Sequence, residues 1–329
     1  MKKFILLCSI LLVSAFSLYP QPNQLISDLE HDYFYNGDFV NVYNRANDLS
    51  GYVEIILDPN NSFIVNLYKF ISETQLNSIN SKEAHARLDK LEENASNLYG
   101  AISRYMGLVY LAKAHYHLEN DHKKALVDGK KSVEILSAVA PNTIELACAL
   151  MVSGYAYIHN DDSSSGEKLL LRSLNILKKN KQQKSWIAMH THSFLAAAYV
   201  FMGKDNDVFK EADKSMDIFN SMEKNGRTTR LAMVPYGMSI FIFTSMGLYD
   251  TAIQVGKDCL ALCKTMQMEN NIVYGCTLQN IGTAYLYKKD NKTGLDYYYL
   301  AKDHYEKYGY TDCSQYQMLI RYLNNLEQK

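Results

Sequence analysis

Small side chains return at a nearly constant interval along this chain of 329 residues. Residues 154–177 and 282–305 share one plan: a glycine, then Ala-Tyr, a polar break with an aspartate, and a second glycine twelve residues after the first. Equivalent small positions are Val42, Ala84, Ala125, Gly166, Val208, Ala252 and Gly294, at intervals of 42, 41, 41, 42, 44 and 42 residues. An aromatic residue lies nine positions before each of them except Ala84. A fixed period of this length is typical of solenoids and other repeat architectures.

The spacing within one unit indicates a pair of antiparallel helices. A second set of small residues follows the first set by seven positions, two helical turns later on the same face, at Ser132, Ser173, Ser215, Cys259 and Ala301. Two helices approach closely where their side chains are small, and an aromatic ring fills the space beside that contact. A single hairpin cannot bury its apolar face alone, so copies stack on one another. We therefore expect an all-α solenoid of stacked antiparallel hairpins.

One pattern recurs along the chain: Gly or Ala, then Tyr three residues later, a small residue nine positions further on and another small residue seven positions after that. It is clearest in residues 154–173, 196–215 and 282–301. In these positions the chain resembles the tetratricopeptide repeat family. The period is about eight residues longer than the commonest one of that family, which resembles its long-helix variety. The resemblance implies a right-handed solenoid over residues 18–310, with one hairpin for each of the seven small positions and the weakest at Ala84, followed by a capping helix in residues 311–329.

The N-terminal residues have the layout of a secretory signal. Lys2 and Lys3 precede an apolar run from Phe4 to Phe16, which is too short to remain as a membrane anchor. We expect residues 1–17 to be a signal peptide and the protein to be exported, with the bacterial periplasm or cell envelope as its location. The N-x-S/T sequences at Asn60, Asn94 and Asn291 leave a eukaryotic secretory route open.

Composition excludes several partners and chemistries. The chain has 34 basic and 35 acidic residues, a balance that predicts no long-range attraction to nucleic acid or to an anionic membrane. Beyond the N-terminal apolar run nothing approaches ~18 consecutive apolar residues, so we expect no stable membrane insertion. Phosphate-binding loops, zinc-binding spacings and nucleophile motifs do not occur, so we expect no enzyme activity, no cofactor and no metal. The five cysteines beyond the signal are predicted to be small core residues, although one disulfide stays possible.

The expected ligand groove is the concave surface formed by the first helix of each hairpin. The resemblance to the repeat family implies that Tyr110, His117, Met151, Tyr155, His159, Phe201, Phe241, Gln279 and Tyr287 line it. This lining is aromatic and nearly uncharged. Because tyrosine is abundant, with 26 residues, many of these rings have a competing explanation as fillers between helices.

We therefore predict a non-catalytic scaffold that binds a peptide or protein segment in its groove. Two alternatives stay open at this point: a sensory partner of an envelope signalling protein, and a helical-repeat protein that binds glycans.

Overall fold

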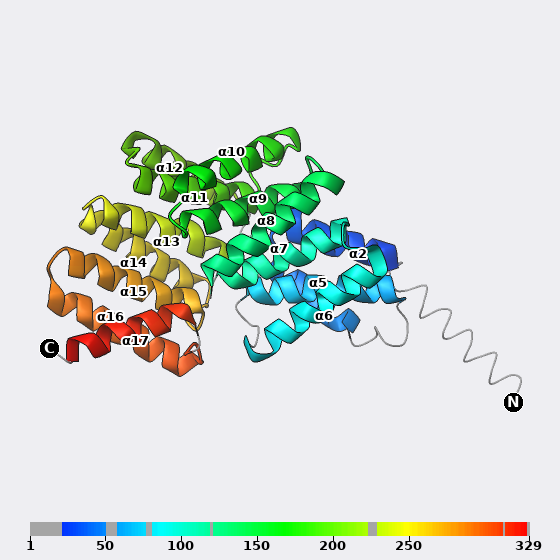
Figure 1. Cartoon of the computed structure of the whole chain (residues 1–329). Coiled ribbons are helices and arrows are strands. Elements are labelled where there is room, and N and C mark those ends of the chain that lie inside the picture. The colour runs from blue at the N-terminus through cyan, green and yellow to red at the C-terminus, as the bar shows by residue number, and fades with distance from the viewer. Residues whose placement is uncertain are drawn as a thin grey trace, which may run out of the picture.

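Antiparallel helices follow one another along the chain (Figure 1). The computed structural model describes residues 22–50, 58–76, 81–118, 121–222, 229–311 and 313–327, and within these ranges the regular elements are helices, without a strand. The expected signal peptide, residues 1–17, lies outside the described residues. The first helices of the hairpins are α2 (Pro22–His31) with the π-helix η1 (Asp32–Asn36), α5 (Pro59–Gln75), α7 (Arg104–Leu118), α9 (Ile144–Ile158), α11 (Trp186–Met202), α13 (Thr229–Ser245) and α15 (Ile272–Tyr287). The second helices are α3 (Phe39–Ser50), α6 (Ser81–Tyr99), α8 (His122–Val139), α10 (Ser163–Lys179), α12 (Asp205–Ser221), α14 (Tyr249–Thr265) and α16 (Asn291–Tyr308), and α17 (Ser314–Glu327) follows them.

The periodic small residues occupy equivalent places in successive hairpins, as the sequence predicts. Each is the fourth residue of the second helix of its hairpin, and each is buried: Val42, Ala84, Ala125, Gly166, Val208, Ala252 and Gly294. The weakest unit in the sequence, at Ala84, obeys the same rule as the others. The all-α solenoid is therefore confirmed, and the period of the sequence is the period of the hairpins.

Close approach of the helix backbones explains why these positions are small. A Cβ atom added at Gly166 would lie 2.8 Å from the carbonyl oxygen of Gly154, and one added at Gly294 would lie 3.0 Å from that of Gly282. Such distances are too short for any side chain beyond hydrogen. The two glycines of the repeated plan are thus the contact point between the two helices of a hairpin.

The second set of small residues ties the helices together further along. Buried serine hydroxyls on three second helices donate hydrogen bonds to backbone carbonyls of the preceding first helix. The bonds are Ser132 to Gly107 at 2.8 Å, Ser173 to Ala147 at 2.7 Å and Ser215 to Met189 at 2.9 Å. A serine fits a narrow contact and satisfies its own hydroxyl there, which is the requirement for a buried polar group.

The aromatic landmark also closes the turn between the two helices. A residue with positive φ ends the first helix at Asp161, Gly203, Gly247 and Lys289, in the left-handed region that terminates many helices. The next N–H then bonds back to the carbonyl of the landmark ring residue. These bonds run from Asp162 to Tyr157, Lys204 to Tyr199, Leu248 to Phe243 and Asp290 to Tyr285, at 2.8 to 3.0 Å. Turn chemistry and helix packing therefore repeat with the same period.

Consecutive first helices from α5 to α15 pack against each other, whereas no comparable contact joins consecutive second helices in the described part of the chain. Helices on the inside of a bend lie closer together than those on the outside. We therefore call α5, α7, α9, α11, α13 and α15 the inner row, and α6, α8, α10, α12, α14 and α16 the outer row. The chain forms an arch, with α2 and α5 in one limb, α10 and α12 at its top, and α16 and α17 in the other limb (Figure 1).

One contact departs from simple stacking of neighbours. The indole Nε1 of Trp186, the first residue of α11, donates a 2.9 Å hydrogen bond to the carbonyl oxygen of Tyr33 in η1, 153 residues earlier. The Trp186 ring also lies 5.2 Å from that of Phe39, edge to face. We call these contacts, together with the bonds of Arg104 on α7 to Glu30 of α2 and Glu145 of α9, the N-terminal clasp. In a regular solenoid each repeat contacts only its neighbours, so the clasp closes the first limb on itself.

Candidate functional site

Beyond α5 and α7, the helices of the inner row contain almost no charged residues. Helices α11 and α15 contain no Asp, Glu, Lys or Arg, α9 contains only Glu145, and α13 contains only Arg230. The charged residues of these hairpins lie on the outer row and in the turns. A segment that binds along the inner row from α9 to α15 is therefore met by uncharged side chains, which favours apolar and neutral polar groups over ionic ones.

Exposed aromatic rings gather at the C-terminal ends of the inner helices. Phe201 near the end of α11 is 61% exposed and its ring lies 5.7 Å from that of Phe241 on α13. Tyr287 at the end of α15 is 64% exposed. Large rings are costly to leave in water, and adjacent ones on neighbouring helices are typical of a binding surface.

A second group of rings extends this surface toward α8. The rings of His122 and His159 stack at 4.1 Å, Tyr155 meets His159 edge to face at 4.5 Å, and Tyr155 stacks on Phe194 at 4.0 Å. His159 is exposed and Tyr155 is half-buried, whereas Phe194 is buried beneath them. The stack therefore holds Tyr155 and His159 in fixed orientations at the inner surface.

Three of the predicted groove residues have other partners. The hydroxyl of Tyr110 donates to Glu92 of α6 at 2.5 Å and accepts from Lys131 of α8 at 3.2 Å, and Nδ1 of His117 lies 2.8 Å from Asp128 of α8. Met151 is buried in the core. Tyr110 and His117 thus face the outer row because α7 is packed between α6 and α8, and these three side chains are not exposed on the inner surface.

Gln279 lies between these cases. It is half-buried, and its side-chain oxygen accepts a 3.0 Å hydrogen bond from the hydroxyl of Tyr305 on α16. Of the nine predicted residues, the structure therefore brings Tyr155, His159, Phe201 and Phe241 to the inner surface of neighbouring helices, with Tyr287 exposed further along. That any of them contacts a ligand stays a prediction.

The opposite ends of the inner helices are covered by the N-terminal clasp. Arg104, the first residue of α7, donates to both carboxylate oxygens of Glu30 in α2, at 3.0 and 3.2 Å, and to Glu145 of α9 through Nε at 3.0 Å. The Tyr68 phenol lies beneath this ion cluster. Its pKa is raised, mainly by burial and to a smaller extent by the negative charge of Glu30. The clasp covers the N-terminal ends of α7, α9 and α11. The C-terminal ends of these inner helices, where Phe201 and His159 lie, are therefore the open ends.

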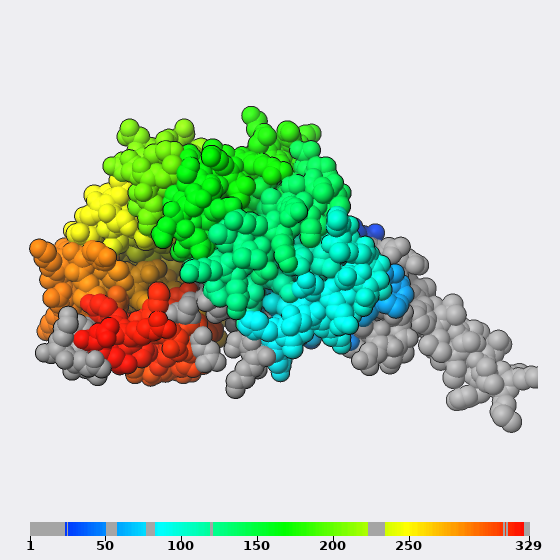
Figure 2. Space-filling model, viewed as in Figure 1, coloured from blue at the N-terminus to red at the C-terminus, as the bar shows by residue number. Residues whose placement is uncertain are grey.

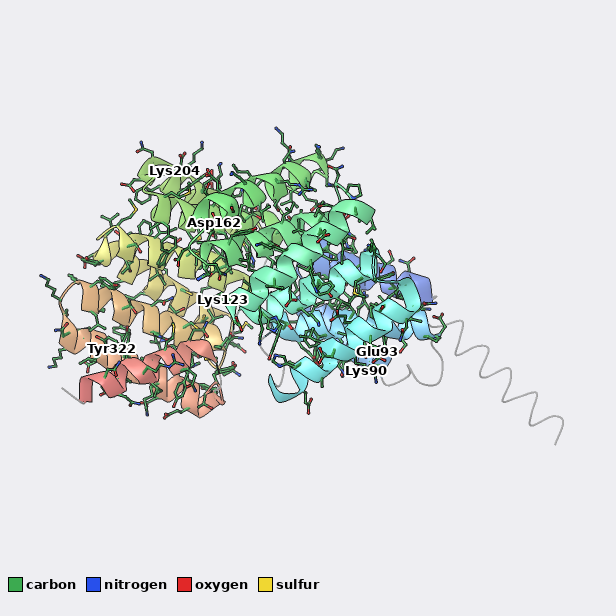
Figure 3. The ribbon with its side chains drawn as sticks, viewed as in Figure 1. Lys90, Glu93, Lys123, Asp162, Lys204 and Tyr322 are labelled. Atoms are coloured by element: carbon green, nitrogen blue, oxygen red, sulfur yellow. The ribbon has the colours of Figure 1, made fainter. Side chains whose placement is uncertain are left out.

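The two views with atoms agree with this description. The surface is hollowed between the middle hairpins, in green, and the C-terminal ones, in orange (Figure 2). Lys123, Asp162 and Lys204, at the turns between the two helices of three successive hairpins, follow one another along one edge of the arch (Figure 3). These turns mark the open end of the inner row.

The metal-ligating and thiol side chains of the described ranges are spread over several helices. No group of three His, Cys, Asp or Glu side chains there is arranged to hold a metal ion. Cys148, Cys259, Cys263 and Cys276 are buried and Cys313 is half-buried, and among the described residues these five form no disulfide. Cys259 occupies the small position that serine fills in three other hairpins, which is the core role expected from the sequence.

Sequence reasoning missed the clasp. Its signal was Trp186, the only tryptophan of the chain, placed at the start of an inner helix. Because the clasp occurs once, it leaves no periodic trace, and a search for repeats passes over it.

Comparisons with known proteins identify the fold. No family model and no curated protein matches the chain. The solved structure of a Rap protein complexed with competence and sporulation factor is similar, with 13% identity over 88% of this chain and 77% of that chain and a TM-score of 0.70.

Two further structures match less closely. A STAND signal-transduction ATPase with a tetratricopeptide repeat sensor, from Pyrococcus horikoshii, has 15% identity and a TM-score of 0.50 over 93% of this chain, which spans 44% of that protein. A putative kinesin light chain of tetratricopeptide-like repeats from Podospora anserina has 12% identity over 62% of this chain and 93% of that chain, with a TM-score of 0.46. The chain therefore has the fold of the tetratricopeptide-repeat-like α-solenoids.

Proposed function

We propose that the protein is a non-catalytic scaffold that binds a polypeptide segment along the inner surface from α9 to α15. The contact of exposed Phe201 with Phe241 across two inner helices is the observation that carries this proposal. Two aromatic side chains on adjacent helices offer a place for one apolar side chain of a ligand, and burial of such anchors supplies most of the affinity in peptide recognition. The Rap protein of similar fold was solved as a complex with competence and sporulation factor, which agrees with a binding role.

The charge-free inner row defines the class of segment. Ionic groups of a ligand would lose their hydration there without gaining a partner, so the bound part is rich in aromatic and aliphatic residues and poor in charge. Binding of this kind depends weakly on ionic strength.

The location of this scaffold belongs to the same proposal. Lys2, Lys3 and the apolar run that follows support export, with the bacterial periplasm or envelope as the destination. N-terminal sequencing of the protein purified from the envelope tests it, with a new N-terminus near residue 18 as the expected result. A protein that keeps its first methionine in the cytoplasm contradicts it.

Peptide display against the full chain tests the binding function. Selected peptides are synthesised and their Kd values are measured by calorimetry with the natural chain, with Phe201→Ala plus Phe241→Ala, and with Leu300→Ala. Leu300 is a matched control because it is 53% exposed on the outer helix α16. Loss of about 2 kcal/mol or more in the aromatic variant, roughly thirtyfold in Kd, is expected from removal of two anchors.

Two results contradict the proposal. Equal affinity in all three proteins would place the peptide elsewhere. Saturable binding of an oligosaccharide that needs Phe201 and Phe241, with no selected peptide competing for it, would instead assign the surface to glycan capture.

A further inference from the structure

Basic residues are segregated in one part of the chain. Between Glu167 and Asp205 there is no acidic residue and there are seven basic ones: Lys168, Arg172, Lys178, Lys179, Lys181, Lys184 and Lys204. The rest of the chain therefore holds 27 basic against 35 acidic residues, so a net charge near zero conceals a stretch of +7 beside a remainder of −8. The exclusion of anionic surfaces on the basis of net charge alone does not hold for this region.

The outer helix α8 shows the same bias around an exposed aliphatic side chain. Val127 is 57% exposed. Lysines lie four and three residues before it and three and four residues after it, at Lys123, Lys124, Lys130 and Lys131, all of them exposed. At these spacings the five side chains share one face of a helix.

Helix α10 repeats this arrangement beside α8. Leu171 is 47% exposed, with Lys168 one turn before it, Arg172 next to it and Lys178 two turns after it. The guanidinium of Arg172 donates a 3.0 Å hydrogen bond to the Ser137 hydroxyl near the end of α8, which ties the two outer helices together. We call the solvent-facing side of α8 and α10 the cationic face.

Carboxylates close to this face offset part of its charge, and one of them, Glu134, is exposed on α8 one turn after Lys130 and Lys131. Glu167 is bonded to Lys204 at 2.9 and 3.0 Å, and Asp128 faces His117. Asp121 lies 3.6 Å from Lys124 at the first turn of α8. Among the described residues, Lys123, Lys168, Lys178 and Lys179 make no ion pair.

We propose that the cationic face docks on an anionic bilayer surface. The cationic face belongs to the outer row, whose consecutive helices do not pack closely against each other in the described part of the chain. Single aliphatic residues that protrude among lysines suit a bilayer, because the lysines meet lipid phosphates while the aliphatic tips enter the headgroup region. Among the described residues no helix has the length and apolarity needed to cross a bilayer, so this contact is peripheral. The inner surface, on the other side of these hairpins, stays open to its ligand.

Co-sedimentation of the full chain with vesicles tests the proposal. Vesicles of phosphatidylcholine alone are compared with vesicles that also contain about 30% of the anionic lipid phosphatidylglycerol. Binding to the anionic vesicles only, falling as salt rises, is expected. Lysines near an anionic surface contribute about fivefold each, so Lys123→Gln with Lys124→Gln, Lys178→Gln and Lys179→Gln reduces partitioning by more than a hundredfold.

A matched variant and an aliphatic variant make the test specific. Lys257→Gln with Lys264→Gln, Lys289→Gln and Lys292→Gln removes the same charge from exposed positions of α14 and the turn and helix of the last hairpin, and leaves partitioning within about threefold. Val127→Ser with Leu171→Ser reduces partitioning about tenfold without changing the melting temperature by more than a few degrees, since both side chains are already exposed.

Three outcomes overturn the proposal. One is no binding to anionic vesicles, and another is equal loss in the two lysine variants. The third is binding to soluble polyglutamate that is lost in the lysine variant of the cationic face but unchanged in the serine variant. That result would assign the face to an acidic polypeptide. None of these results bears on the peptide site, because Phe201 and Phe241 remain in every variant.

Discussion

We count α2 to α12, with the top of the arch, as its first limb and α13 to α17 as its second limb, and the two are held together in different ways. Residues from Leu29 to Ile242 share one continuous core, and the clasp adds a contact between η1 and α11 across 153 residues. From Ile240 in α13 onward the buried side chains divide into two smaller clusters, one around Ile240, Ile253 and Ile281 and one from Cys259 to Leu323. Among the described residues, the contacts of the second limb join neighbouring helices, as in an ideal solenoid. The comparison teaches that one hairpin folded inward can turn part of a linear array into a single cooperative unit.

The largest expected effect comes from removing the clasp. Trp186→Ala deletes a fully buried indole together with its bond to Tyr33, and we expect a loss of about 3–5 kcal/mol in the free energy of unfolding. Trp186→Phe keeps a smaller ring and loses the hydrogen bond, so a smaller loss of about 1–3 kcal/mol is expected. Urea unfolding followed by circular dichroism measures both. A loss under 1 kcal/mol for the alanine variant would contradict the role of the clasp.

Matched glycine substitutions compare the two limbs directly. A Cβ at Gly154 would meet Leu170 at 2.8 Å and one at Gly282 would meet Tyr298 at 2.5 Å, so each alanine variant should lose about 1–3 kcal/mol. Gly154→Ala is expected to raise hydrogen exchange throughout the first limb, whereas Gly282→Ala raises it only from α13 onward. Gly237→Ala is the control, because its Cβ would meet nothing within 4 Å, and it stabilises α13 by about 0.5–1 kcal/mol.

Acid is expected to weaken the second limb first. Burial lowers the pKa of His304 below its usual value, and the charge of Lys307 acts in the same direction, against a backbone hydrogen bond to Glu269. The neutral imidazole is therefore the folded form, and stability falls as pH drops below about 6.5, by at most about 1.4 kcal/mol per pH unit. The rings of Tyr274, Tyr308 and Tyr310 lie around the His304 ring.

Exchange measured between pH 7.5 and 5 checks this dependence. Protection of α15 and α16 should fall with pH in the natural chain and stay level in His304→Gln, which has no titrating ring. Equal pH dependence in the two proteins would show that another group is responsible.

The smallest effect concerns a single repeated bond. Ser173→Ala removes the 2.7 Å hydrogen bond to the Ala147 carbonyl in the first limb and leaves that oxygen without its serine partner, at an expected cost of about 1 kcal/mol. Cys259→Ser makes the reciprocal change in the second limb, where the thiol lies 3.4 Å from the Thr277 hydroxyl. Thermal melts of both variants should differ from the natural chain by only a few degrees.

Features that recur in every hairpin can be predicted from the sequence, whereas contacts that occur only once in the molecule cannot. The spacing of Val42, Ala125 and Gly294 is visible because every hairpin needs the same clearance at the same turn. The hydrogen bond of Trp186 reaches Tyr33, 153 positions earlier in the chain. Its acceptor is a backbone carbonyl, which every residue has, so the sequence does not show which residue accepts the bond. A π-helical turn at η1, which ends at Gly37 with φ of 66°, is equally hard to foresee.

The candidate site shows the same limit. Phe201 and Phe241 lie close together because α11 and α13 pack against each other in the inner row, and their role in binding stays a prediction. Tyr110 and His117 depart from it, because Glu92, Lys131 and Asp128 of the outer row draw their polar atoms away from the inner surface. Local hydrogen bonds of this kind depend on pairs in space that one sequence does not display.

Native-state hydrogen exchange of the full chain, resolved by mass spectrometry, tests the central claim that the clasp makes the two limbs unequal. We predict one common high protection for the slowest amides of α5, α7, α9 and α11, and lower, stepwise protection from α14 to α17. Uniform protection along the whole chain, or a second limb more protected than the first, would contradict that claim.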